Sequence, residues 1–151
     1  MTSLINDNIH IRNYQSSDHG EVISLWKRAR LAFKPTGRDS RKNMEKELEK
    51  GQCFFLLAVD ENDRILGTVL ATNDGRKGWI NRLAVDPEMR NHGIARILVK
   101  EAEERLKQNG IGIIACLIED WNSDSSEVFK HLGYNEFKGI KYLTKRSRPD
   151  I

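Results

Sequence analysis

A short polar turn between a strand pattern and a helix pattern is the part of the sequence with the clearest chemistry. The segment Arg90–Ala95 reads RNHGIA and follows the apolar run Trp79–Val85. The first amides of a helix have no partner within the helix and carry the positive end of its dipole, so they can hold phosphate oxygens. Gly93 lets a ligand approach the backbone, and Arg90 adds a permanent cation. The turn is therefore predicted to bind an anion; the plainer alternative is a helix start that binds nothing.

The segments on either side of this turn are predicted to be a strand and a helix. Trp79–Val85 is apolar and β-branched enough for a strand buried on at least one face, and Asp86-Pro87 ends it because proline donates no hydrogen bond to a ladder. After the turn, apolar residues recur on one helical face with charged residues opposite: Ala95, Leu98, Val99, Ala102 and Leu106.

The rest of the chain divides into short strand and helix patterns. Strands are expected at Asn8–Tyr14, Cys53–Val59, Arg64–Thr72 and Gly112–Ile118, the last buried and parallel to Trp79–Val85. A helix is expected after Asp18, which has capping-box spacing with Glu21. Its apolar face extends as far as Phe33, and Lys34–Gly37 ends the helix. Further helices are expected at Ser40–Lys50 and Ser123–Leu132, and a final hairpin at Tyr134–Phe137 and Ile140–Thr144.

The turn motif and the order of elements resemble one known family. Arg90-x-x-Gly93-x-Ala95, after an apolar strand and Val85-Asp86-Pro87, is similar to the acyl-CoA pyrophosphate loop of the GNAT superfamily of N-acyltransferases. The resemblance covers nearly the whole chain as a single domain, 1–151. It implies an α/β (α+β) fold with a mixed, mostly antiparallel sheet of six to seven strands, a central splayed parallel strand pair, and about four flanking helices. The splayed pair would be Trp79–Val85 and Gly112–Ile118.

A second motif of the family supports the first. Members often carry Asn, a small residue, Tyr and then Gly-Phe/Tyr at fixed spacing, and this chain has Asn122, Ser125, Phe129, Gly133 and Tyr134. Phe129 is the departure, because it stands where the family usually has the Tyr that acts as general acid. The resemblance implies that acetyl-CoA is the cosubstrate, with no metal. It assigns cofactor contacts to Leu83, Ala84, Val85, Arg90, Asn91, His92, Gly93, Ile94, Ala95, Arg96, Asn122, Ser125 and Phe129.

Acyl transfer from a thioester to an amine needs a neutral amine, a donor for the oxyanion and a stabilised thiolate. The resemblance implies that the oxyanion donor is a backbone amide near Leu83–Val85. Glu119, at the exit of the second splayed strand, is the first candidate for general base, and an exposed charge at a strand end is the alternative. Weaker candidate bases are Asp120, Asn81 and His92, and Tyr134 and Tyr142 are substitute acids. Trp26, Trp79 and Phe33–Arg38 are candidates for the wall of the acceptor pocket.

Composition limits the class of protein. Charged residues make up 31% and apolar residues 38% of the 151 residues, which suits one globular domain, and the net charge of +3 is too small to indicate nucleic-acid binding. No apolar run approaches the length of about 18–20 residues that spans a bilayer, so no membrane partner is expected. Cys53 and Cys116 lie in apolar runs without CxxC spacing, which favours buried thiols in a cytoplasmic protein.

The leading functional prediction is an acetyl-CoA-dependent N-acetyltransferase in which an amine attacks directly in a ternary complex. The alternative is an acyl-CoA-binding sensor or interaction module with little or no activity, which Phe129 mildly favours. A small nucleic-acid-binding protein is disfavoured because no basic-aromatic pattern occurs, and a P-loop protein because GxxxxGK is absent. The amine stays open between polyamine, amino acid, aminoglycoside, protein N-terminus and lysine, and the assembly between monomer and homodimer.

Overall fold

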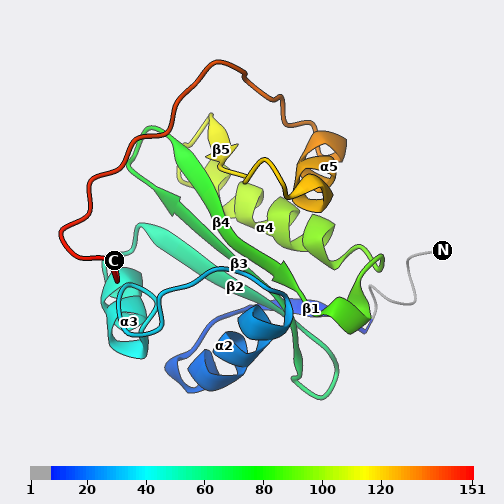
Figure 1. Cartoon of the computed structure of the whole chain (residues 1–151). Helices are drawn as coiled ribbons and strands as arrows, with labels where there is room; N and C mark the ends of the chain where they lie inside the picture. The colour runs from blue at the N-terminus through cyan, green and yellow to red at the C-terminus, as the bar shows by residue number, and fades with distance from the viewer. Residues whose placement is uncertain (1–7) are drawn as a thin grey trace.

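The structure is a computed structural model that describes residues 8–151 (Figure 1). Its strands form one sheet in the order β1-β2-β3-β4-β5: β1 His10–Asn13, β2 Cys53–Val59, β3 Ile65–Asn73, β4 Gly78–Val85 and β5 Ile114–Cys116. Its helices are α2 His19–Arg28, α3 Arg41–Glu49, α4 Ile94–Gln108 and α5 Ser123–His131, with the one-turn helices η1 Ser16–Asp18 and η2 Pro87–Met89. Neighbouring strands are antiparallel except β4 and β5, which are parallel. The expected mostly antiparallel sheet and the parallel pair formed by the strands before and after α4 are confirmed.

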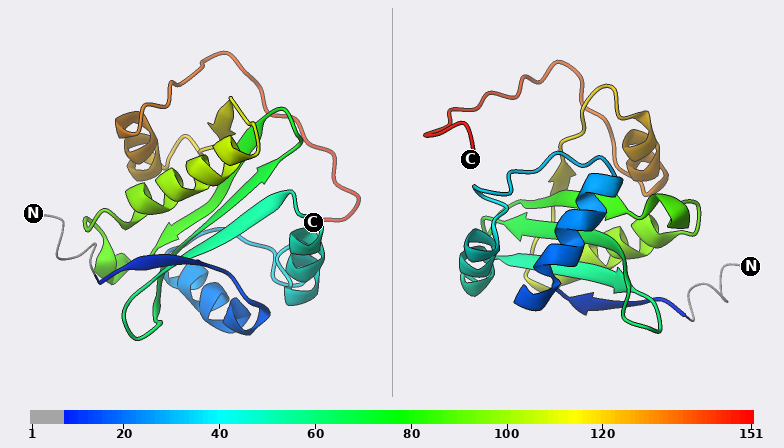
Figure 2. Two further views of the ribbon diagram at one scale, coloured as in Figure 1. Left: turned by 180° about the vertical axis from the view of Figure 1, so that it is seen from behind. Right: turned by 60° about the horizontal axis from the view of Figure 1, so that its bottom comes forward.

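Helices cover both faces of the sheet, which explains the uninterrupted apolar sequence of β2. α4 lies against one face and α2 against the other (Figure 2). Leu56 and Ala58 of β2 pack in the cluster that contains α4, whereas Phe55, Leu57 and Val59 pack in the cluster that contains α2. Two cores therefore hold the sheet rigidly between the helices.

The predicted apolar face of α4 is confirmed, and it brings the helix very close to the sheet. Leu98, Val99, Ala102 and Leu106 are fully buried. A side chain at Gly67 of β3 would have its Cβ 3.0 Å from both Ile94 and Leu98. Glycine at this position allows the start of α4 to lie directly over β3. The turn before α4 is thereby fixed to the sheet.

The N-terminal part of α2 differs from its prediction in two respects. Asp18 and Glu21 do not form a capping box, because the Asp18 carboxylate binds Arg12 at 2.8 Å and the Gln15 amide at 2.8 Å. Glu21 instead accepts a hydrogen bond from the Ile65 amide of β3 at 2.8 Å. The helix also ends at Arg28 and does not continue toward Phe33, since Arg30 adopts a left-handed φ of 60°.

β5 is shorter and more exposed than predicted. Only Ile114–Cys116 forms a strand within the expected Gly112–Ile118, and its residues are half-buried. Ile113 and Leu117 are 56% and 57% exposed. An apolar run indicates strand propensity, but β5 lies at the edge of the sheet and has a neighbour on one side only. The prediction of a fully buried strand was therefore wrong.

The predicted C-terminal hairpin is also wrong, so the sheet has five strands within residues 8–151 instead of six to seven. Residues 134–144 form no strand, and Gly139 has a φ of 83°. The segment runs from α5 back toward α3, where the C-terminus lies (Figure 1). Its large apolar residues are 69% to 87% exposed: Phe137, Ile140, Tyr142 and Leu143. Alternating apolar residues give strand propensity, but a strand also needs a partner and a covered face.

Candidate functional site

A buried carboxylate holds the turn that joins β4 to α4. Asp86 is 1% exposed and caps η2 by accepting a hydrogen bond from the Glu88 amide at 3.0 Å. Arg28 and Arg64 reach the same carboxylate at 3.1 Å and 3.3 Å. Burial raises the pKa of Asp86, but the Glu88 amide and the arginines outweigh it, so the pKa lies below its usual range. Asp86 therefore stays ionised and ties the turn to α2 and β3.

The turn itself has the backbone that an anion site requires. Asn91 and Gly93 have left-handed φ values of 65° and 78°, and Gly93 is the N-cap of α4. No side chain within residues 8–151 caps the first amides of α4. A Cβ at Gly93 would meet no heavy atom within 4 Å, so the space in front of these amides is open. The helix N-terminus is thus free to donate hydrogen bonds to phosphate oxygens.

The predicted side chains of the turn divide into two groups. Arg90 and Arg96 are exposed, and neither forms an ion pair with any residue in the described part of the chain. Ile94 is 1% exposed and packs in the core, so only its backbone faces the turn. The Nδ1 atom of His92 is buried and has no hydrogen-bond partner among residues 8–151. Free cations, free amides and an unpartnered ring nitrogen fit a polyanion such as a pyrophosphate.

The parallel strands β4 and β5 separate as the resemblance implies. Their pairing ends at Ile80 and Cys116, whereas β4 continues to Val85. Within the part of the chain that the structure describes, Asn81–Val85 therefore has β3 on one side and an unpaired backbone edge on the other. The predicted contacts Leu83, Ala84 and Val85 lie on this edge, directly before the turn. An extended ligand arm can lie along it and hydrogen-bond the strand.

A β-bulge with a strained residue interrupts β4 at the same place. The register between β3 and β4 shifts beyond Thr68, and Arg82 has a left-handed φ of 52°. Thr68 is fully buried and donates to the Arg82 carbonyl at 2.8 Å, while Trp26 donates its indole proton to Thr68 at 2.9 Å. Bulges often lie beside active sites, where they re-aim side chains, and a left-handed residue costs about 1–3 kcal/mol. Trp26 is fully buried in the core, and it also supports the bulge.

The Arg82 side chain forms a bidentate ion pair with Asp39, from the linker before α3. The guanidinium donates to the two carboxylate oxygens at 3.2 Å and 2.8 Å, and it lies over the Trp26 ring at 5.6 Å from the centroid. Asp39 also accepts from the Lys34 amide at 2.7 Å and is 4% exposed. This pair joins the linker to β4.

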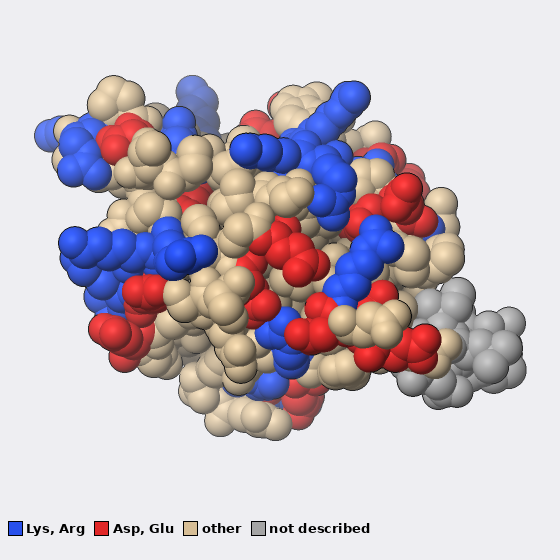
Figure 3. Space-filling view, turned by 90° about the horizontal axis from the view of Figure 1, so that it is seen from below, with Lys and Arg blue, Asp and Glu red and all other residues tan. Residues whose placement is uncertain are grey.

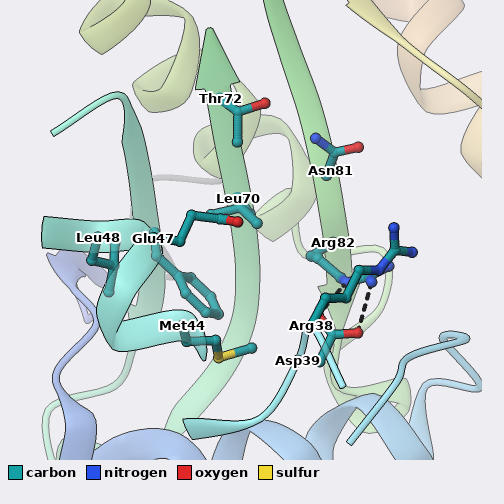
Figure 4. Close-up of a pocket in the computed structure, with 10 residues that line it drawn as sticks. Arg38, Asp39, Met44, Glu47, Leu48, Leu70, Thr72, Asn81 and Arg82 are labelled. Carbon is teal, nitrogen blue, oxygen red and sulfur yellow. Dashed lines mark hydrogen bonds and ion pairs between the residues drawn. The ribbon is translucent and has the colours of Figure 1, made fainter. Parts of the chain in front are cut away.

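A cavity of about 170 Å³ lies beside this ion pair, between α3 and the sheet (Figure 4). Its apolar lining comes from α3, β2 and β3: Met44, Leu48, Phe55 and Leu70. Its polar lining comes from α3, β3, β4 and the linker: Arg38, Asp39, Glu47, Thr72, Asn81 and Arg82. Arg38, from the expected stretch Phe33–Arg38, lines this cavity, whereas Trp79 and Glu119 are not part of its lining. On the side where α2 and α3 lie, basic and acidic side chains are interspersed (Figure 3).

The motif that begins at Asn122 forms the start of α5. Asn122 is the N-cap and accepts a hydrogen bond from the Ser125 amide at 3.2 Å. Phe129 is 5% exposed and contacts Tyr134 edge-on, with ring centroids 5.0 Å apart. The Tyr134 hydroxyl donates to Glu103 at 2.7 Å; burial and this carboxylate raise the pKa of Tyr134 above its usual range. Tyr134 is therefore a packing residue and a poor proton donor, and Tyr142 is 69% exposed in the C-terminal segment.

Sequence reasoning missed Asp39, Glu47, Thr68 and Arg82. Asp39 and Glu47 stand in charged stretches, where each is indistinguishable from a solvated residue. Thr68 and Arg82 lie in strand patterns that carry no sign of a bulge. The sequence offered one weak signal of this ion pair. A half-buried arginine within an otherwise apolar strand needs an acidic partner, but the sequence does not show which residue that partner is.

Among the helices in residues 8–151, none has the length and apolar character needed to cross a membrane. The same residues hold no group of three or more His, Cys, Asp or Glu side chains placed to bind a metal ion.

The fold and the turn define an acyltransferase of the GNAT type, and comparisons with known proteins agree. Residues 13–134 match the model of the acetyltransferase (GNAT) family. The chain belongs to this family. Because the match includes the turn, the splayed strands and α5, it extends over every part of the site described above.

Solved structures share the fold at low sequence identity. A predicted acetyltransferase with acetyl-CoA from Clostridium acetobutylicum is 19% identical, with a TM-score of 0.73 over 90% of this chain and 96% of that one. An aminoglycoside 6'-N-acetyltransferase from Acinetobacter baumannii is 20% identical, with a TM-score of 0.75 over 91% and 98%. The PaiA N-acetyltransferase from Thermoplasma acidophilum, in complex with coenzyme A, is 19% identical, with a TM-score of 0.73 over 84% and 89%.

Proposed function

We propose that the protein transfers an acetyl group from acetyl-CoA to a primary amine by direct attack in a ternary complex. The observation that carries the proposal is the uncapped N-terminus of α4 placed at the end of the unpaired edge of β4. The turn Arg90–Arg96 would hold the pyrophosphate, and the edge Asn81–Val85 would hold the pantetheine arm. This arrangement directs the thioester toward the separation between β4 and β5.

The bulge in β4 would set the position of the reacting carbonyl. A backbone amide near Leu83–Val85 is the proposed oxyanion donor, and the buried Thr68 holds the neighbouring Arg82 carbonyl in a fixed orientation. Loss of one oxyanion donor costs about 3–4 kcal/mol in other enzymes, so a fixed backbone contributes strongly to the rate. The pocket beside Arg82 would receive the amine.

The protonation state of the two thiols supports direct attack. Burial raises the pKa of Cys53 and of Cys116 to about 11, so both are protonated near neutral pH. A protonated thiol is a weak nucleophile, and an acyl-enzyme intermediate would need a thiolate. The amine nitrogen would therefore attack the thioester carbon itself: a C–N bond forms, the C–S bond breaks, and CoA leaves as the thiolate.

Proton transfer in this site would differ from the family pattern. Phe129 cannot donate a proton, and Tyr134 is bound to Glu103, so the CoA thiolate would take its proton from water. Glu119 remains a candidate general base from its place after β5; it is exposed, and its carbonyl accepts a hydrogen bond from the Asn122 amide at 2.9 Å.

An acyl-CoA sensor with little or no activity is the second candidate function. The observation in its favour is the buried Phe129, which packs against Tyr134 where the family usually has a proton donor. Both candidates require the same CoA site. They differ only in turnover.

Calorimetric titration with acetyl-CoA, CoA and ATP, followed by a thiol-release assay against a panel of amines, tests both candidates. Micromolar binding of both CoA species but not ATP, with thiol release for at least one amine, is the expected result. Binding without turnover on any amine would favour the sensor. Absence of CoA binding would refute both.

A further inference from the structure

The pocket next to the β4 bulge has a chemical character that limits the amine it can accept. On the proposed function, this pocket faces the thioester from the side of the sheet that α2 and α3 cover (Figure 4). Its apolar wall combines Met44 and Leu48 of α3 with Phe55 and Leu70 of the sheet. Such a wall can contact the methylene groups of an aliphatic chain.

The charges in the pocket are not equivalent. Asp39 and Arg82 neutralise each other in a bidentate pair, and both are held further by the linker and by Trp26. Glu47 forms no ion pair or side-chain hydrogen bond with any residue in 8–151. Its carboxylate projects from α3 into the space beside Leu70 (Figure 4). Glu47 is therefore the acid of this pocket that is available to a ligand.

We propose that Glu47 binds the ammonium group of an aliphatic primary amine and accepts its proton before the attack. The acceptor class is an unhindered amine at the end of an alkyl chain, as in a polyamine or a lysyl side chain. The apolar wall would contact the methylenes. One N–H proton of the ammonium passes to the Glu47 carboxylate, and the freed lone pair forms the C–N bond while the C–S bond breaks and CoA leaves as the thiolate. The second N–H proton is lost to water as the amide forms, the thiolate takes up one proton from water, and Glu47 returns its own proton to water.

The surroundings of Glu47 suit this role. Glu47 is an exposed residue, as Glu49 is, but partial desolvation of its carboxylate beside the pocket and the nearby Asp39 carboxylate raise the pKa of Glu47 above its usual range. Lys50, Arg82 and Arg38 oppose this shift. A carboxylate with a raised pKa is a better proton acceptor than an ordinary one, because its pKa lies closer to the working pH. An amine with an adjacent carboxylate would bring a second negative charge toward Glu47, which disfavours α-amino acids.

The test compares Glu47→Gln with Glu49→Gln, a change of the same charge on the same helix. Glu49 is exposed and does not line the pocket. The probes are spermidine and Nα-acetyl-lysine amide as alkyl ammonium ions, and L-glutamate and L-phenylalanine as amines beside a carboxylate. Because hydrogen bonds to charged groups are strong, we expect Glu47→Gln to lower kcat/KM for the alkyl ammonium probes by about 10- to 100-fold. Glu49→Gln should leave it unchanged.

Acetyl-CoA affinity, measured by calorimetry, separates this proposal from the proposed function. If the wild-type chain binds no acetyl-CoA, the function itself fails. If it binds and turns over, the role of Glu47 is refuted by equal kinetics of Glu47→Gln and Glu49→Gln, or by faster acetylation of L-glutamate than of spermidine and Nα-acetyl-lysine amide. Both variants should bind acetyl-CoA as the wild type does and stay folded, because neither side chain has a partner in residues 8–151 to lose. Glu47→Gln should melt slightly above the wild type near neutral pH, because the raised pKa means that the ionised carboxylate destabilises the fold.

Discussion

Replacing Gly93 by alanine should weaken CoA binding far more than it weakens the fold. Gly93 has a φ of 78° and open space at its Cβ position, so the cost to stability is backbone strain without a clash. A left-handed conformation costs a residue with a Cβ about 1–2 kcal/mol. For a chain of this size that lowers Tm by about 2–8 °C. A domain with about 5–15 kcal/mol of stability remains folded.

Gly110 provides a matched control at the other end of α4. It has a φ of 80° and also meets no heavy atom within 4 Å of its Cβ position. Gly110→Ala should therefore lose the same stability as Gly93→Ala. Only the methyl group at Gly93 would stand in front of the free amides of α4, where it displaces a phosphate oxygen from one of them. Because hydrogen bonds to charged groups contribute about 1.5–3 kcal/mol, the Kd for CoA should rise about 10- to 150-fold.

Calorimetric titration with CoA and thermal unfolding of both variants check this prediction. Gly93→Ala and Gly110→Ala should melt together below the wild type, while only Gly93→Ala binds CoA weakly. Gly93→Trp should abolish binding, since the larger side chain fills the turn. Equal CoA affinities for Gly93→Ala and Gly110→Ala would show that the N-terminus of α4 is not the phosphate site.

Three further perturbations test the bulge, the missing acid and an ion pair. Thr68→Val should lower the free energy of unfolding by about 1–3 kcal/mol, because it leaves the buried Trp26 indole proton unpaired. Thr68→Ser keeps the hydroxyl group and should retain most of the turnover that Thr68→Val loses. Denaturant unfolding and kcat measure these effects. Phe129→Tyr should keep CoA affinity and raise kcat if proton donation limits the rate, and loss of cooperative unfolding would instead show that the site is purely core. Asp18→Asn should make Tm fall less steeply as the pH is lowered. The Arg12 hydrogen bond lowers the folded-state pKa of Asp18, so the stability that Asp18 contributes is fully present above its unfolded-state pKa and is lost as the pH falls through its folded-state pKa. An unchanged Tm profile from pH 6 to pH 3, roughly the range in which a carboxylate titrates, would contradict this.

Much of the scaffold was predictable because its signals are local. The apolar face of α4 and the helices expected at Ser40–Lys50 and Ser123–Leu132 each depend on residues within about two turns of helix, and all three are confirmed. The turn around Gly93 is local too, since its left-handed φ favours glycine whatever the rest of the fold does. These elements already place an anion site after a strand.

The failed predictions depended on partners that the pattern does not name. Asp18 and Glu21 have capping spacing, but Arg12 and the Ile65 amide compete for their carboxylates. Residues 134–144 have strand propensity, but no neighbouring strand and no covered face within the described chain. Local propensity is a weak prior that tertiary contacts override.

The sequence by itself determined the turn, the order of helices and strands as far as α5, and the family membership that the motifs imply. The tertiary structure alone decided which charges are neutralised and which are available. Arg82 is far from Asp39 in sequence, yet it donates to that carboxylate at 2.8 Å, and this pairing leaves Glu47 as the free acid of the pocket. The physical reason is that ion pairing and burial depend on distance in space, and only the packing of the linker and α3 against β4 sets that distance.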